Sequence, residues 1–164
     1  MLRIGRSTDV HRLKSGESLR LGGIDIPSEF ETIAHSDGDC LLHAISEAFL
    51  GALALGDLGT HFPDTDSTAR GRDSRDILKT VLEWTSERGF SLVNLDATVH
   101  LERPKLAPHV YDLRDSIARL LGAEMEQISI KATTGESLYP VGSKEAIICE
   151  CTLLLEKTKE VTPL

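Results

Sequence analysis

The sequence predicts an α+β fold in which a single mixed β-sheet carries helices packed on one face. Two observations support this prediction. Strand-like segments of alternating or continuous apolar residues take turns along the chain with longer segments whose apolar residues recur at helical spacing. Elements that alternate in this way build one sheet with helices packed against it. The face of the sheet that no helix covers would remain bare, and self-association is its expected cover.

The composition is that of one globular domain spanning residues 1–164. Hydrophobic residues make up 40% and charged residues 27% of the chain, and a chain of this length can bury a core without disulfide bonds. The formal net charge of −8 and the aromatic content of 4% argue against nucleic-acid binding, because nucleic acids attract cations and stacking aromatic rings. No apolar run reaches membrane-spanning length, so no membrane partner is expected.

Three irregularly spaced cysteines, Cys40, Cys149 and Cys151, predict packed thiols rather than a disulfide framework. Such cysteine usage indicates a reducing compartment. The first residues show no signal-peptide pattern. Together these features predict a cytoplasmic protein.

The first elements are expected before residue 54. Residues 2–9 are expected to form a strand, and residues 19–27 a short strand pair around two glycines. Ser36 and Asp39 have the spacing of a capping box, which predicts a helix start. Apolar residues at helical spacing then continue to Leu53, which indicates a helix up to that residue.

The rest of the chain alternates helices and strands after a long connection. Residues 56–71 have no apolar period and are rich in Gly, Pro, Asp and Thr; a connection of this length in a small domain is usually functional or disordered. Beyond it the patterns predict, in order, a helix over 74–88 that ends at Gly89, a strand over 91–102, a helix from Pro108 to about 121, and strands over 128–133 and 146–155.

Asp9, His11 and His43 form the strongest candidate site. An Asp and a His two residues apart on a strand point to the same face, and a second imidazole can arrive from the helix that holds His43. Oxygen and nitrogen donors suit zinc, and three protein ligands leave one coordination position open for substrate or water. Glu47 or Asp39, on the same helical stripe as His43, could orient an imidazole. The plain alternative is that each histidine is a hydrogen-bonded surface or core residue.

Three further segments have both a functional and a plain interpretation. Residues 56–66 hold three aspartates and glycine hinges, which suits polyol binding and closure over a substrate, or simply a turn-rich linker. Arg103–Pro108 could bind a flat heterocycle through its backbone, with a lysine near phosphate, or form a charged turn before a helix. Lys131–Glu136 could hold phosphate oxygens through its hydroxyls and a hard cation through Glu136, or form a strand end and a turn.

These segments, in this order, resemble the 2-C-methyl-D-erythritol 2,4-cyclodiphosphate synthases, enzymes of the non-mevalonate isoprenoid pathway. The resemblance covers essentially the whole chain, and the stretch from Ala34 to Asp66 is its most specific part. It is carried by Asp9–His11, Leu21–Ile24, Ala34–Asp39, Leu55–Gly59, Phe62–Asp66, Asp73–Arg75, Pro104–Lys105 and Lys131–Thr134.

The resemblance implies a phosphorus–oxygen lyase. Its substrate would be 4-diphosphocytidyl-2-C-methyl-D-erythritol 2-phosphate, whose 2-phosphate attacks the β-phosphate in line. This releases CMP and closes 2-C-methyl-D-erythritol 2,4-cyclodiphosphate. The resemblance further implies one Zn²⁺ per subunit on Asp9, His11 and His43, and a Mg²⁺ or Mn²⁺ ion on Glu136 that bridges the α- and β-phosphates. Catalysis of this kind depends on positioning and charge neutralisation.

The resemblance also assigns roles to the remaining site residues. His35 and Thr134 match positions that stabilise the transition state. Contacts to the methylerythritol phosphate are implied for Ser36, Asp57, Leu58, Gly59, Phe62, Pro63, Asp64, Thr65 and Asp66. The cytidine pocket is implied for Leu101, Arg103, Pro104, Lys105, Leu106, Ala107, Ala132 and Thr133. Members of the family are homotrimers whose sheets pack around a three-fold axis, with each active site between neighbouring subunits.

Some positions depart from the family pattern. Arg, Ser and Thr occupy positions 6–8, where the family usually has His, Gly and an aromatic residue. Gly135 stands in place of a Thr or Asn, and Ser143 replaces an arginine that faces the trimer axis. One alternative function is therefore a zinc-stabilised trimer that binds a nucleotide or an isoprenoid phosphate without catalysis, and another is a metal-dependent phosphohydrolase. The intact match at the transition-state positions favours the cyclising enzyme.

Overall fold

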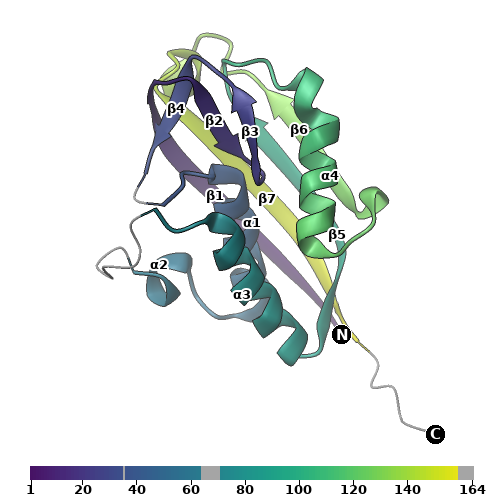
Figure 1. Ribbon diagram of the computed structural model, residues 1–164. Coiled ribbons are helices and arrows are strands. Elements are labelled where there is room, and N and C mark those ends of the chain that lie inside the picture. Colours follow the sequence, from purple (N-terminus) through teal and green to yellow (C-terminus); the bar gives the residue numbers. More distant parts are fainter. Residues whose placement is uncertain (35, 64–70, 159–164) are drawn as a thin grey trace, which may run out of the picture.

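The computed structural model describes residues 1–34, 36–63 and 71–158. Its framework is a five-stranded sheet with the strand order β4-β1-β7-β5-β6 (Figure 1). These strands span Leu2–Ser15 (β1), Phe30–Ile33 (β4), Phe90–His100 (β5), Ile128–Thr133 (β6) and Ala146–Lys157 (β7). β5 and β6 run parallel, and the other neighbouring pairs run antiparallel. The sheet is therefore mixed, as predicted.

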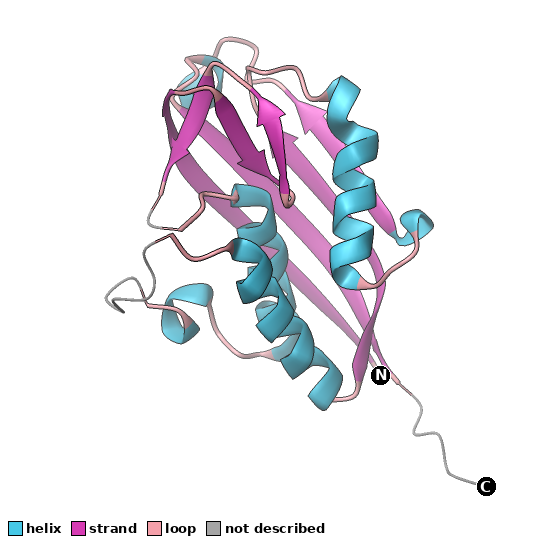
Figure 2. Cartoon of the chain, in the orientation of Figure 1, coloured by secondary structure: helices cyan, strands magenta, loops and turns pink. Residues whose placement is uncertain are grey.

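The long helices lie together on one face of this sheet, which confirms the predicted α+β arrangement (Figure 2). They are α1 (Cys40–Leu53), α3 (Ser74–Glu87) and α4 (Val110–Leu121). Shorter elements are α2 (Leu58–His61), α5 (Tyr139–Gly142) and two 3-10 turns, Ala107–His109 and Met125–Gln127. The strands β2 (Ser18–Leu21) and β3 (Ile24–Pro27) form a separate hairpin in front of the same face.

α1 is the central helix of the core. It contacts β1 and β7 beneath it and α3 above it, and Leu41, Ile45 and Phe49 on it are buried. Each fully buried side chain of this kind stabilises the fold by about 1.5–3 kcal/mol through removal of apolar surface from water. Because α1 is held from both sides, any group on its first turns has a fixed position relative to β1.

The start of α1 differs from the prediction. Asp39 is the N-cap residue and accepts a hydrogen bond of 2.9 Å from the Leu42 amide, so the capping box expected from Ser36 is wrong. The buried carboxylate of Asp39 also accepts hydrogen bonds from the amides of Gly22, at 2.9 Å, and Gly23, at 2.7 Å. Burial raises the pKa of Asp39, and these amide hydrogen bonds oppose that shift. One side chain thus joins the β2–β3 turn to the start of α1.

Gly5 determines how closely β1 approaches α1. A methyl group at this position would lie 1.8 Å from the backbone carbonyl oxygen of Ala48, which cannot move unless the helix moves. We expect Gly5→Ala to lower the free energy of unfolding by about 1–3 kcal/mol or more, the usual cost of overpacking. Thermal or urea unfolding measures this.

The matched control for that substitution is Gly51→Ala. A methyl group on Gly51 in α1 would meet its nearest neighbour at 3.9 Å, an ordinary contact, and alanine favours the helix over glycine. This variant should be as stable as the original protein or slightly more stable. Equal melting temperatures for Gly5→Ala and the original protein would contradict the packing argument.

The face of the sheet opposite the helices is uncovered and partly apolar. Side chains alternate between the two faces along β1, and Ile4 is 72% exposed on the outer face. Ile4 pairs with Leu154 of β7, and the exposed Val10 pairs with Ile148, so apolar side chains from neighbouring strands lie together. Exposed apolar patches of this kind mark interaction surfaces when they are large. This is the bare face that the sequence predicts.

The other predicted helices and strands are present, with differences in extent and three elements missed. β1 continues past the predicted end to Ser15, and β5 ends at His100 rather than at residue 102. The strand β4 and the short helices α2 and α5 were not predicted. The three cysteines are buried and free, as expected, and burial raises the pKa of Cys151. In the part of the chain that the structure describes, no helix has both the length and the apolar character needed to cross a membrane.

Candidate metal centre and active site

The structure brings Asp9, His11 and His43 together between β1 and α1. Asp9 and His11 lie two residues apart on β1 and face α1, and His43 lies on the first turn of α1. Asp9 Oδ2 is 3.1 Å from His11 Nε2 and 3.4 Å from His43 Nδ1, and the two imidazole nitrogens are 3.3 Å apart. All three side chains are partly buried. The predicted metal-ligand group is thus assembled within one chain.

The residues present fit a tetrahedral zinc ion. Ligand atoms at about 2.0–2.1 Å from a tetrahedral zinc lie about 3.3 Å from one another, and the three observed separations match this value. Asp9 Oδ2 is buried and accepts no hydrogen bond of proper geometry from the described residues. A buried carboxylate oxygen without a donor is costly, and a bound cation would remove that cost.

The charges of the triad reinforce one another. Burial raises the pKa of Asp9, but the neighbouring imidazoles of His11 and His43 outweigh burial and lower this pKa well below its usual range. Burial lowers the pKa of His11, but Asp9 outweighs it and the net shift is upward. Without metal, His11 therefore gains a proton more readily than a free imidazole. Because a metal ligand must be deprotonated, metal affinity should fall as the pH is lowered.

Hydrogen bonds on the far side of each ring orient both imidazoles. His11 Nδ1 lies 3.1 Å from the Gly38 carbonyl, to which it donates, and this leaves Nε2 available for a metal. His43 Nε2 lies 2.9 Å from Ser74 Oγ, whose hydroxyl donates to Asp37. His43 Nδ1 is therefore the nitrogen that faces the site. Sequence reasoning missed these partners, because a backbone carbonyl and a serine on another helix leave no pattern near either histidine.

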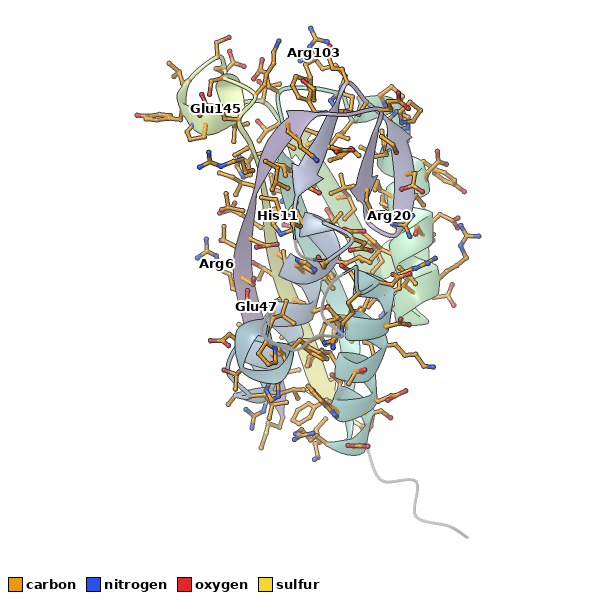
Figure 3. The ribbon with its side chains drawn as sticks, turned by 60° about the vertical axis from the view of Figure 1, so that its left-hand side comes forward. Arg6, His11, Arg20, Glu47, Arg103 and Glu145 are labelled. Atoms are coloured by element: carbon orange, nitrogen blue, oxygen red, sulfur yellow. The ribbon has the colours of Figure 1, made fainter. Side chains whose placement is uncertain are left out.

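Asp39 and Glu47 were predicted to lie beside His43 on one face of its helix, and the structure gives them different roles. Asp39 is the helix cap, so its prediction as an imidazole partner is wrong. Glu47 lines the same cavity as His43 and accepts a hydrogen bond of 3.3 Å from Ser7 Oγ. In Figure 3, Glu47 lies apart from His11, lower in the view. Glu47 therefore contributes negative charge to the cavity rather than orienting an imidazole.

A cavity of about 370 Å³ opens onto the triad. Besides the three ligand residues it is lined by Ser36, Leu58, Gly59 and Phe62 from the predicted substrate segment, and by Ile33, Ala34, Glu47, Arg72 and Ile77. Ser36 Oγ lies 3.3 Å from His43 Nε2. The cavity combines a metal-ligand group, carboxylates, one arginine and apolar walls, which suits a small polar and anionic ligand.

Other residues of the predicted substrate segment lie near α2 or outside the described residues. Asp57 is the N-cap of α2 and accepts hydrogen bonds from the Thr60 amide, at 2.8 Å, and hydroxyl, at 2.7 Å. Pro63 lies just after Phe62, the C-cap residue of that helix. His35, Asp64, Thr65 and Asp66 lie outside the described residues.

The predicted cytidine and second-metal residues form a separate group at the ends of β5 and β6. The Leu101 amide donates to the Thr133 carbonyl at 2.9 Å, which joins the two segments beside Ala132. Figure 3 shows Arg103 at one end of the molecule, away from His11. Within the described chain, the lining of the metal cavity includes no member of this group.

The members of this group differ in exposure. The polar members and Ala107 are exposed, and Pro104 is partly buried. Leu101 and Leu106 are buried in the core. The side chains of these two leucines therefore support the loop from inside. Lys105 is exposed beside Pro104, where its charge can reach a ligand.

Just beyond the end of β6, Thr134 is partly buried and Glu136 is exposed. The Thr134 hydroxyl donates to Glu136 Oε1 at 3.1 Å, and the Gly135 amide donates to Glu102 Oε2 at 3.1 Å. A methyl group on Gly135 would lie 2.5 Å from the backbone nitrogen of Gly142. Close packing of the backbone against Gly142 therefore requires glycine at position 135.

Comparisons with known proteins agree with this geometry. The model of the YgbB family matches residues 2–156. A curated protein of Ectopseudomonas mendocina, named 2-C-methyl-D-erythritol 2,4-cyclodiphosphate synthase, is 49% identical over 95% of this chain and 99% of its own length. A protein of Geobacter sulfurreducens with the same name is 51% identical over the same shares of the two chains.

Solved structures are similar over nearly the whole chain. A structure of 2C-methyl-D-erythritol-2,4-cyclodiphosphate synthase superposes with a TM-score of 0.87 at 41% identity and covers 94% of this chain and 100% of its own. A complex of the Plasmodium falciparum protein IspF with CDP has a TM-score of 0.85 at 31% identity, with coverage of 96% and 97%.

Proposed function

Because this chain belongs to the YgbB family, we infer that it is a cyclodiphosphate synthase of isoprenoid precursor biosynthesis. The observation that carries the conclusion is the Asp9, His11 and His43 triad at a polar cavity, in a chain whose full-length relatives bear this activity in their names. The reaction converts 4-diphosphocytidyl-2-C-methyl-D-erythritol 2-phosphate into 2-C-methyl-D-erythritol 2,4-cyclodiphosphate and CMP. This assigns the enzyme to the phosphorus–oxygen lyases.

In this reaction one phosphorus–oxygen bond forms and one breaks. An oxygen of the 2-phosphate bonds to the β-phosphorus, and the bond between that phosphorus and the oxygen shared with the α-phosphate breaks, so that CMP leaves with the electron pair. The chain's contribution is to place the two groups in line and to limit access of water, which would otherwise compete as a nucleophile. Cavity residues Ser36, Leu58, Gly59 and Phe62 are suited to hold the methylerythritol part.

The metal of the triad is proposed to be zinc. Two imidazole nitrogens and one carboxylate oxygen are a common zinc donor set with an open position. When bound, zinc supplies Lewis acidity and offsets negative charge on a phosphate oxygen. Asp9, His11 and His43 would hold it, and the Gly38 carbonyl and Ser74 hydroxyl would keep the imidazoles in the required orientation.

A second ion, Mg²⁺ or Mn²⁺, is proposed at Glu136. Hard cations of this kind prefer oxygen ligands and usually take one or two carboxylates together with substrate phosphates. The exposed carboxylate of Glu136 offers such a ligand. Thr134 beside it, together with His35, would stabilise the charge that develops on the reacting phosphate. Lys105 and its neighbours would hold the cytidine part.

We propose that the complete active site forms between two subunits of a homotrimer. Two features support this. The sheet has a bare apolar face on which copies can pack, and among the described residues the lining of the metal cavity includes neither Thr134 nor Glu136. Closed rotational symmetry would repeat each contact and complete every site.

Mixing two inactive variants should restore activity if the sites are shared. His43→Ala disables the metal side and Lys105→Ala the cytidine side, but a mixed trimer contains interfaces at which both sides are intact. Random assembly gives about a quarter of the sites this composition. Recovery is measured after mild dissociation and reassociation of the two proteins together. Recovery no greater than that of each variant treated alone, or a monomer in light scattering at micromolar concentration, would contradict shared sites.

Product analysis tests the proposed function directly. The protein with zinc and Mg²⁺ should convert the substrate into equal amounts of CMP and the cyclic diphosphate, detected by ³¹P NMR. A phosphohydrolase would instead release inorganic phosphate or CDP. A nucleotide-binding protein without catalysis would bind the substrate and leave it unchanged.

We further infer that residues 1–164 act as one domain in the cytoplasm. One hydrophobic core joins the sheet to α1, α3 and α4, which supports the single domain. The three buried, unpaired cysteines are typical of a reducing compartment.

A further inference from the structure

We propose that Arg72 binds the 2-phosphate of the substrate, the group that attacks the β-phosphate. This inference rests on the proposed function and adds a cavity residue to the predicted site. Arg72 immediately precedes Asp73, the N-cap of α3, and lies half-buried in the wall of the metal cavity. Its position gives the cavity two separate sites for the anionic groups of one substrate.

The charges of the cavity require a cation for this phosphate. A phosphate monoester carries a charge of about −1.5 to −2 near pH 7. The carboxylates of Asp9 and Glu47 line the same cavity and would repel it. Among the described residues of the cavity wall, Arg72 supplies the only guanidinium or ammonium group. In the proposed site zinc would offset negative charge on the diphosphate, and Arg72 would offset the charge of the monophosphate.

An aromatic stack supports the guanidinium group. Arg72 Cζ lies 5.5 Å from the centroid of the Phe62 ring, within the range of a cation–π contact. The Phe62 ring stacks on Trp84 of α3, with centroids 5.9 Å apart and an interplanar angle of 21°, and Trp84 packs against the core. The contact with Phe62 engages the face of the guanidinium and sets its plane, and the N–H groups of the guanidinium lie along the edge of that plane.

The backbone of Arg72 is tied to the metal ligand His43. The Arg72 carbonyl accepts a hydrogen bond of 3.1 Å from the Asp37 amide. The Asp37 carboxylate accepts hydrogen bonds from the amide and hydroxyl of Ser74, and Ser74 Oγ lies 2.9 Å from His43 Nε2. The segment from Arg72 to Ser74 therefore holds the arginine at a set position relative to the metal centre.

Arginine is suited to this task by its shape. Its planar fork can donate two parallel hydrogen bonds to two phosphate oxygens. The third oxygen then has a defined direction, which is what an in-line attack requires. A lysine at the same place would supply the charge without fixing the orientation.

The test compares two ligands on three variants, all loaded with zinc and kept without Mg²⁺ or Mn²⁺ to suppress turnover. The ligands are the substrate and the same compound without its 2-phosphate, and calorimetry measures both affinities. Arg72→Gln removes the charge, and Arg72→Lys keeps the charge but loses the fork. Arg75→Gln is the matched control, because Arg75 forms an ion pair with Asp73 and does not line the cavity.

The original protein should bind the substrate, which carries the 2-phosphate, more tightly than the compound that lacks it. Arg72→Gln should weaken binding of the substrate by about 10- to 100-fold, as expected for lost hydrogen bonds to a charged group. It should leave the affinity for the compound without the 2-phosphate unchanged. Arg72→Lys should be intermediate, and Arg75→Gln should match the original protein. Zinc content and melting temperature verify that each variant is folded.

Two outcomes would overturn the assignment. One is an Arg72→Gln protein that still prefers the substrate over the compound without the 2-phosphate to the full extent. The other is an equal loss of affinity for both ligands. In either case, if the original protein forms CMP and the cyclic diphosphate, the proposed function is correct and only the role of Arg72 is wrong. If the original protein binds neither ligand and forms no product, the function and the assignment fall together.

Discussion

His43→Ala should fold normally but lose both its zinc and its activity. The substitution removes Nδ1 of His43 and leaves two ligands where the geometry requires three. Zinc affinity should fall below the level that survives gentle purification, and turnover should fall by about 10³-fold or more, since Lewis-acid stabilisation of a phosphoryl oxygen is worth several kcal/mol. Metal analysis of the purified variant and single-turnover kinetics measure the two effects.

Two further variants calibrate this result. Ser74→Ala removes the hydroxyl that orients the His43 ring and should weaken zinc binding by about 10- to 100-fold, the usual effect of such partners. His109→Ala changes a histidine of the 3-10 turn outside the metal cavity and should keep a full zinc equivalent. The ligand assignment is wrong if His43→Ala also keeps a full zinc equivalent per chain.

Thr134→Ala should bind substrate nearly normally but turn it over about 10²–10³-fold more slowly, the usual loss when a donor to a developing charge is removed. In the proposed assembled site its hydroxyl would donate to an oxygen whose charge grows in the transition state, so the loss should appear in turnover rather than in substrate affinity. Thr134→Ser keeps the hydroxyl and should retain most of the activity. Substrate affinity and turnover, measured separately, distinguish the two effects.

Glu136→Gln should act on the second ion instead. It should raise the concentration of Mg²⁺ or Mn²⁺ needed for half-maximal activity while leaving zinc in place, because the two proposed ions would have separate ligands. The backbone at Gly135, next to Glu136, packs closely against Gly142. A proportional loss of affinity and turnover in Thr134→Ala, or loss of zinc from Glu136→Gln, would show that the two roles are assigned wrongly.

The sequence predicted the parts of the fold that depend on local patterns. Helical and strand periodicity correctly indicated the long helices and most strands, and the alternation of side chains along a strand placed Asp9 and His11 on one face. β4 was missed because Phe30–Ile33 is half-buried and mixes polar with apolar residues, so it has no clear alternation.

The supporting contacts of the site could not be read from the sequence. Asp39 has the spacing of a histidine partner, yet its carboxylate is used by backbone amides. Ser74, which does contact His43, lies on α3 and is brought there by tertiary packing. Arg72 gains its place in the cavity wall in the same way, since nothing in its neighbourhood along the chain distinguishes it from the arginine at position 75.

The β2–β3 turn has a practical consequence for protein engineering. A hairpin turn is ordinarily an exposed site that accepts an inserted peptide or new chain ends. Here the amides of Gly22 and Gly23 bind Asp39, and the Gly22 carbonyl accepts a hydrogen bond of 2.7 Å from Ser116 Oγ. An insertion at this turn would release the start of the metal-binding helix.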